Sequence, residues 1–183
     1  MDPLQQDRRG LLLMVGTLGV SGFASRSLVA PQGASRRPDV VGPDEGEHLI
    51  HFRDGGNIYI KSSRATGWTD LAVGTQQVKV GTGIPTHRHF DMDEAFFILD
   101  GAGGVVLDDV RHPFGKGSAI FIPKMTWHSF ENPEQELLLL WMVTPAGLDA
   151  FFRATCSPPG APVKELSREQ IREIALKYGT EFR

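Results

Sequence analysis

Residues 81–101 of the chain read GTGIPTHRHFDMDEAFFILDG. This stretch carries two histidines separated by one residue, His87 and His89, and a carboxylate, Glu94, five residues further on. Side chains alternate between the two faces of a β-strand, so His87 and His89 project to one face and Arg88 to the other. Glu94 leads into an apolar strand, residues 95–99, and its carboxylate can return to the same point if the two strands are neighbours. The spacing therefore predicts a site shared by the three side chains.

A third histidine, His128, lies in the segment Trp127-His128-Ser129-Phe130 near the end of the β-rich region. Three imidazoles and one carboxylate suit Fe, Mn, Ni, Cu or Zn, and they leave positions open on an ion that prefers six ligands. One negative ligand also leaves net positive charge on a divalent ion, which Lewis-acid activation of a bound oxygen ligand requires. The alternative is that these histidines are ordinary core residues. We predict one divalent metal ion per chain, held by His87, His89, Glu94 and His128.

Short apolar runs separated by turn signals follow one another from residue 47 onward. The runs occupy residues 49–52, 57–60, 71–80, 95–99, 104–107, 119–122, 127–130 and 137–143. Many short, evenly spaced strands are typical of a β-sandwich or a β-barrel.

The region from residue 146 to 183 changes to helical periodicity. Pro145 and Gly147 indicate the start of a short helix, and Ser167 with Gln170 forms a capping box for a second helix that Gly179 would end. We predict a C-terminal helical extension over residues 146–183 whose apolar positions pack against the outer face of the barrel or a second subunit.

These residues resemble the two sequence motifs of the cupin superfamily. The first motif, G-x5-H-x-H-x4-E-x6-G, is matched at every spacing by Gly81, His87, His89, Glu94 and Gly101. The second motif, G-x5-P-x-G-x2-H-x3-N, is matched by Gly117, Pro123, His128 and Asn132, with Met125 where glycine is usual. The departure at Met125 concerns the local turn more than the metal site, because His128 keeps its offset from Pro123.

The resemblance spans residues 47–145 and implies an all-β fold, the double-stranded β-helix or jelly-roll barrel of cupins. It also implies a range of functions: dioxygenases, isomerases, epimerases, decarboxylases and non-catalytic binders of small molecules. Fold alone does not choose among them. Cupins of this size commonly pair through their sheets, so the resemblance favours a homodimer.

The strand alternation also predicts a lining for a pocket beside the metal. Phe96 and Ile98 share the inward face with Glu94, and Thr126 and Phe130 share the side of His128. Such a lining suits a small organic molecule, although a packed barrel core would show the same pattern. The other histidines, His48, His51 and His112, match no motif position and are expected on the surface or in strands.

Composition and the N-terminal region limit the partners of the chain. The chain has 183 residues with a formal net charge of -3 and no long basic run, so nucleic acid is not expected as a partner. Arg8 and Arg9 precede a short, glycine-rich apolar stretch, which predicts a twin-arginine export signal over residues 1–30 and a periplasmic or secreted protein. The alternative is a cytoplasmic protein with an N-terminal arm. Residues 31–46 are rich in Pro and Gly and are predicted to be a linker, and no membrane span is expected in the mature chain.

The predicted site favours a dioxygenase-like oxidoreductase that acts on a small organic molecule. In that role Glu94 could also leave the metal to accept a proton. A redox-silent isomerase or decarboxylase and a binding protein without turnover remain the alternatives. A protein exported in the folded state takes its metal in the cytoplasm, where weaker binders can compete, and this favours Fe or Mn over Ni, Cu or Zn.

Overall fold

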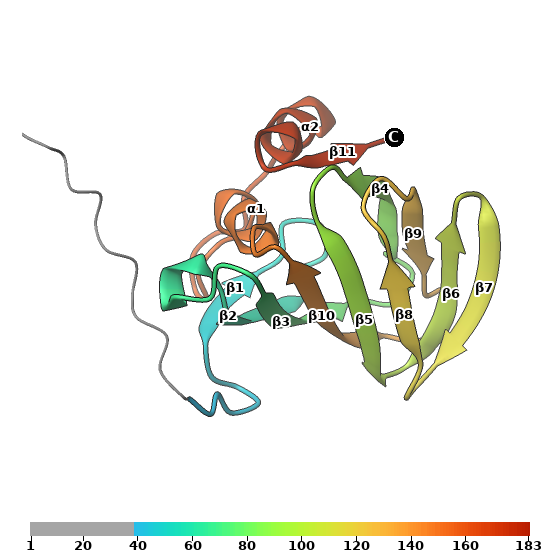
Figure 1. The fold of residues 1–183 in the computed structure, drawn as a ribbon, viewed down its shortest axis with the longest axis horizontal. Coiled ribbons are helices and arrows are strands. Elements are labelled where there is room, and N and C mark those ends of the chain that lie inside the picture. The colour runs from blue at the N-terminus through green and yellow to red at the C-terminus, as the bar shows by residue number, and fades with distance from the viewer. Residues whose placement is uncertain (1–38) are drawn as a thin grey trace, which may run out of the picture. The chain divides into compact units, whose positions relative to one another are not determined.

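The computed structural model describes residues 39–183 and contains two antiparallel β-sheets that face each other (Figure 1). The predicted export signal, residues 1–30, and residues 31–38 of the predicted linker lie outside the described residues. Residues 39–46 form neither helix nor strand. No helix in the described part of the chain is long and apolar enough to cross a membrane.

One sheet has the strand order β1-β2-β3-β10-β5-β8. Its strands are β1 (Glu47–Ile50), β2 (Asn57–Ser62), β3 (Ala72–Val78), β5 (Asp93–Asp100), β8 (Ala119–Ile122) and β10 (Leu137–Thr144). A short 3-10 helix, η1 (Arg64–Thr66), joins β2 to β3.

The other sheet has the strand order β11-β4-β9-β6-β7. Its strands are β4 (Ile84–His89), β6 (Ala102–Leu107), β7 (Val110–Gly115), β9 (His128–Glu131) and β11 (Thr180–Phe182). The predicted fold class, an all-β jelly-roll barrel with a short C-terminal helical extension, is confirmed.

Strand β10 shows why this sequence forms a barrel wall. Its alternate side chains Leu137, Leu139, Trp141 and Val143 are all buried in the core. Trp141 pairs with Gly74 on β3, where a Cβ atom would come within 2.3 Å of the indole ring. Gly74 therefore provides the space that the largest buried side chain of the core needs.

Two helices cover one end of the barrel, α1 (Leu148–Thr155) and α2 (Arg168–Lys177) (Figure 1). The predicted capping box is present at the start of α2. The backbone N–H of Gln170 donates to Ser167 Oγ at 3.2 Å, and the backbone N–H of Ser167 donates to Gln170 Oε1 at 2.9 Å. Gly179 follows the helix with a φ of 75° and turns the chain back toward the barrel.

The chain after α2 forms a strand, β11, that the predicted helical extension did not include. Thr180 and Phe182 of β11 pair with His89 and His87 of β4, and the N–H of Phe90 donates to Gly179 O at 2.9 Å. Three residues are too few for a strand to be recognised by periodicity, which is why the sequence did not predict β11. The C-terminal segment thus becomes the edge strand beside the predicted metal ligands.

The turn before β9 explains the glycine that the cupin motif prefers there. Met125 has a φ of 69°, a left-handed conformation that favours glycine, and its N–H donates to His89 O at 2.7 Å. The methionine side chain is 48% exposed, so packing contributes little at this position. The turn keeps its geometry with methionine at the expense of backbone strain.

Replacing this methionine with glycine should therefore stabilise the protein. The left-handed strain of a non-glycine residue costs about 1–2 kcal/mol, and the greater chain entropy of glycine offsets about half of that gain. We expect Met125→Gly to raise the free energy of unfolding by about 0.5–1 kcal/mol in chemical denaturation. Met125→Ala is the control and should give no such gain; equal effects of the two variants would contradict the strain account.

Candidate metal centre

The four predicted ligands come from both sheets of the barrel. Strand β4 carries His87 and His89, and β9 carries His128, which pairs directly with His87. Strand β5 of the facing sheet supplies Glu94. All four side chains are buried, and one potential ligand atom from each lies within 4.8 Å of the others. The structure therefore brings the whole predicted ligand set together between the sheets.

The carboxylate of Glu94 is the centre of this cluster. Its Oε2 lies 3.1 Å from His89 Nε2 and 3.2 Å from His128 Nε2. The rings of His87 and His128 have their centroids 4.0 Å apart. Although His128 Nε2 is close to the carboxylate, it forms no hydrogen bond with a described residue and is fully buried. A buried ring nitrogen without a hydrogen bond is expected of a histidine whose Nε2 binds a metal ion.

Hydrogen bonds to the other ring nitrogens orient the histidines. Nδ1 of His87 donates to Pro85 O at 2.8 Å, and Nδ1 of His128 donates to Thr126 O at 3.0 Å. These bonds place the proton of each neutral ring on Nδ1 and leave the Nε2 lone pair for a ligand. Nδ1 of His89 lies 2.9 Å from Thr180 Oγ1, which can accept the same kind of bond. All three imidazoles can thus present Nε2 to one ion.

The pKa shifts of His87 and Glu94 also suit a metal site. Burial, with smaller effects of His128 and His89, lowers the pKa of His87 well below its ordinary value. Burial alone would raise the pKa of Glu94, but His89 and His128 more than offset this and hold that pKa below its ordinary value. Neutral imidazoles and an ionised carboxylate are the forms that bind divalent metals. The residues present fit a Fe, Mn, Ni, Cu or Zn ion, and nothing in the donor set selects one of them.

A cavity of about 450 Å³ adjoins the cluster. His87, His89 and Glu94 line the cavity, whereas His128 lies behind them, 1% exposed. A ligand in the cavity would therefore reach the cluster from one side.

The cavity lining differs in part from the one that strand alternation predicted. Phe96 lines it, but Ile98, Thr126 and Phe130 do not. Ile98 is fully buried in the core, and the ring of Phe130 packs against Phe96 at 4.7 Å. Thr126 instead contributes its carbonyl oxygen to His128.

The sequence reasoning missed the residues that close the cavity. The cavity lining includes side chains from both helices and from β11, among them Leu148, Phe151, Phe152, Ile171 and Phe182. The helical spacing predicted apolar positions in residues 146–183 but assigned them to the outer face of the barrel or to a second subunit, whereas these side chains line the cavity.

The structure also places the three other described histidines and Cys156. His51 was expected on the surface or in a strand, but it is 2% exposed, follows β1 and lines the cavity. His48 bonds to Asn57 at 2.8 Å in β1, and His112 is exposed on β7. Cys156 is buried, and burial raises the pKa of its thiol, so it is unsuited to act as a nucleophile.

Comparison with known proteins agrees with the fold and the motifs. Residues 74–144 match the family described as the cupin domain, and this range contains all four clustered residues. An uncharacterized protein of Methanocaldococcus jannaschii is 38% identical over 55 residues, which cover 30% of this chain and 44% of that protein. Protein SchB of Streptomyces halstedii is 36% identical over 81 residues, which cover 44% of this chain and 59% of that protein.

Among solved structures, the polyketide cyclase RemF from Streptomyces resistomycificus is similar with a TM-score of 0.52 and 21% identity. The alignment covers 74% of this chain and 92% of RemF, and at this identity it bears on the fold alone. The chain spans about half the length of the curated relatives that it matches.

Thr180 should tune metal binding although it is no ligand. Its hydroxyl group orients His89, and loss of such a partner typically weakens metal affinity about 10- to 100-fold. We expect Thr180→Val to weaken the binding of Zn²⁺ by about 10-fold or more in a competition titration with a chromophoric chelator. Thr180→Ser keeps the hydroxyl group and should restore wild-type affinity; an unchanged affinity in Thr180→Val would show that the contact does not matter.

Proposed function

We propose that the chain is a metal-dependent, dioxygenase-like oxidoreductase that acts on a small organic molecule, on the basis of the clustered residues and of the match of residues 74–144 to the cupin domain family. The observation that carries the proposal is the one-sided access to the ligand cluster. His87, His89 and Glu94 line the cavity, and the barrel wall with His128 closes the opposite side. A substrate in the cavity would therefore lie beside the open positions of an ion held by these residues.

The chain's own residues would orient the ligands and exclude water. A bound iron or manganese ion would supply open coordination positions and the ability to activate dioxygen. The hydrogen bonds of His87 and His128 to backbone carbonyls keep both rings fixed. The aromatic wall, with Phe96, Trp141 and Phe151, would keep bulk water from the substrate.

The supply of acid and base groups favours metal chemistry over acid–base chemistry by the protein. Glu94 is the one carboxylate that lines the cavity in the described part of the chain. If its Oε2 left the ion it could hold a proton taken from the substrate, but the described lining contains no second carboxylate for a two-base mechanism. A reaction in which the ion and dioxygen do most of the chemistry needs no such pair.

We propose iron or manganese as the ion. The reason is the proposed twin-arginine export, which moves folded proteins and so allows loading in the cytoplasm, where these weaker binders can compete. Stoichiometric copper in protein purified from its native compartment would contradict this choice.

A redox-silent isomerase or decarboxylase is the second candidate. The donor set is compatible with this candidate, because three imidazoles and one carboxylate bind zinc as well as iron. In this case the ion would act only as a Lewis acid, and turnover would continue without oxygen.

Oxygen consumption separates these candidates. The chain, stripped of metal and reloaded with Fe²⁺, Mn²⁺ or Zn²⁺, is screened with phenols, flavonoids, thiols and diketones in an oxygen electrode. We expect uptake with iron or manganese and a loss of about 100-fold or more in His128→Ala, with no change in the control His112→Ala on exposed β7.

Other outcomes of this screen are equally informative. No uptake with any of the metals would contradict the dioxygenase proposal. Turnover with zinc under strict exclusion of oxygen would support the Lewis-acid candidate instead. A ligand that copurifies and is never converted would favour a binding protein.

A further inference from the structure

The cavity beside the metal residues carries an excess of positive charge. In the part of the chain that the structure describes, its lining contains one carboxylate, Glu94, and four arginines: Arg53, Arg168, Arg172 and Arg183. Glu94 is already committed to the histidine cluster. A mostly apolar cavity with this charge balance favours an anion over a neutral or cationic ligand.

Two of these arginines lie at the opening of the cavity. Arg168 and Arg172 are one turn apart on α2, border the cavity on either side of Ile171 and are exposed to solvent. Neither has an ion-pair or hydrogen-bond partner among residues 39–183. Arg183 differs from them, because Asp109 binds its Nη1 at 3.1 Å.

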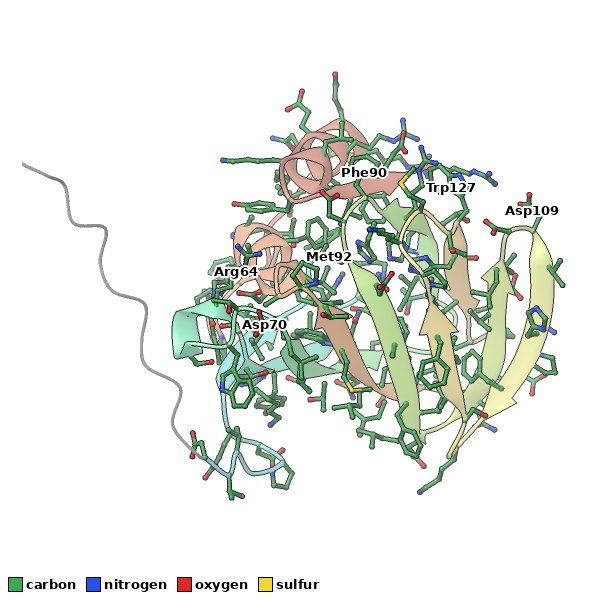
Figure 2. All side chains as sticks on the ribbon, viewed as in Figure 1. Arg64, Asp70, Phe90, Met92, Asp109 and Trp127 are labelled. Atoms are coloured by element: carbon green, nitrogen blue, oxygen red, sulfur yellow. The ribbon has the colours of Figure 1, made fainter. Side chains whose placement is uncertain are left out.

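Figure 2 shows Trp127 at the same end of the barrel as β11 and Asp109 at the tip of the β6–β7 hairpin. The Arg183 guanidinium lies 4.5 Å from the centre of the Trp127 ring. Arg183 is thus held by two contacts of its own, which leaves Arg168 and Arg172 as the free positive charges at the opening.

Arg53 is the partly buried positive charge of the cavity wall, with 16% of its side chain exposed. Its Nε and Nη2 are buried and have no hydrogen-bond partner within the described chain. Asp54 Oδ2 lies 3.5 Å from Nη2, but this carboxylate already accepts the backbone N–H groups of Gly56 and Lys79, each at 3.1 Å. Arg53 stays charged and keeps this ion pair, but its Nε and Nη2 lack the hydrogen bonds that a buried charged group requires.

His51 adds a further donor to the same wall. Its Nδ1 accepts a hydrogen bond from the backbone N–H of Arg53 at 3.0 Å, so the neutral ring carries its proton on Nε2. Burial, together with the nearby Arg53, lowers the pKa of His51 well below its ordinary value and keeps the ring neutral. No described residue accepts a hydrogen bond from Nε2. Arg53 and His51 therefore present donors without an acceptor from the protein.

The rest of the wall suits an apolar body. Six Phe and Trp side chains of the described chain line the cavity: Phe52, Phe96, Trp141, Phe151, Phe152 and Phe182. The ring of His51 stacks on Phe52 at 4.5 Å, so the polar and aromatic parts of the wall are continuous. A ligand complementary to this wall has an apolar or aromatic body and one anionic group.

We propose that the cavity binds a small organic carboxylate, with the carboxylate group at Arg53 and His51 and the apolar body along the aromatic wall toward His87 and Glu94. Arg168 and Arg172 attract the anion to the opening. The planar guanidinium of Arg53 matches a carboxylate through paired N–H···O bonds, and a monoanion is less costly to bury than a phosphate dianion. The assignment of this ligand as substrate rests on the proposed function, whereas its binding does not.

Calorimetric titration of the full chain tests the binding directly, without turnover. The probes are benzoate, phenylacetate and cinnamate, each compared with its neutral amide, and phenyl phosphate. Titrations are run with metal-free and Zn²⁺-loaded protein in the absence of oxygen. We expect at least one carboxylate to bind both forms about tenfold or more tightly than its amide, because the amide lacks the charged acceptor for the N–H groups of Arg53.

The variants locate the interaction. Arg53→Gln should weaken carboxylate binding by about tenfold or more, and Arg53→Lys should weaken it less, since the charge remains without the planar fork. Arg168→Gln/Arg172→Gln should weaken it by about two- to threefold at low salt, and this difference should disappear at high ionic strength. Lys177→Gln removes a positive charge from α2 away from the cavity and should leave binding unchanged.

Several results would overturn the proposal. Binding of amides as tight as that of carboxylates, or no binding of any carboxylate, would exclude an anion site. Carboxylate binding that needs zinc and is unchanged in Arg53→Gln would place the carboxylate on the metal instead. Tighter binding of phenyl phosphate would assign the site to phosphate esters. Oxygen uptake plays no part in these titrations, so failure of the dioxygenase proposal would leave their outcome untouched.

Discussion

The buried carboxylate of Glu94 is the group on which the arrangement of this barrel depends. A carboxylate between two apolar sheets costs several kcal/mol to bury unless charges or strong donors surround it. Two Nε2 atoms of the facing sheet lie within 3.2 Å of Oε2, but that of His128, whose Nδ1 carries the ring proton, offers a lone pair rather than a donor. The ligand cluster therefore links the two sheets, and a divalent ion bound by the same four groups would satisfy the carboxylate and the unpaired nitrogen of His128 together.

The C-terminal segment connects this cluster to the cavity. Strand β11 lies beside β4, so Thr180 contacts His89 while Phe182 stacks on His87 with ring centroids 5.3 Å apart. Helix α2 packs over the same end and carries the two free arginines to the opening. One short segment thus orients a metal residue, closes the cavity and sets the charge at its entrance. A change in the C-terminal segment would alter all three properties.

The ligand set could be predicted from sequence because it depends on local periodicity. His87 and His89 share a strand face, and Glu94 lies at the start of the next strand, where alternation fixes its direction. The cavity lining could not be predicted from sequence, because the inward face of β5 borders the open cavity at one end and the packed core at the other. Glu94 and Phe96 line the cavity, whereas Ile98, one step further along that face, is fully packed. His51 and β11 reach the site only through tertiary contacts that leave no local signal.

Metal content is the most direct measure of whether these four side chains form one metal centre. Protein purified from its native compartment is compared by elemental analysis with a His87→Ala/His128→Ala variant and with a His48→Ala/His112→Ala control. We predict about one equivalent of one of the five candidate ions in the native protein and in the control, and its loss from the first variant. Metal that remains in the first variant, or a folded native protein that takes up none of the five candidate ions, would contradict a metal centre at Glu94.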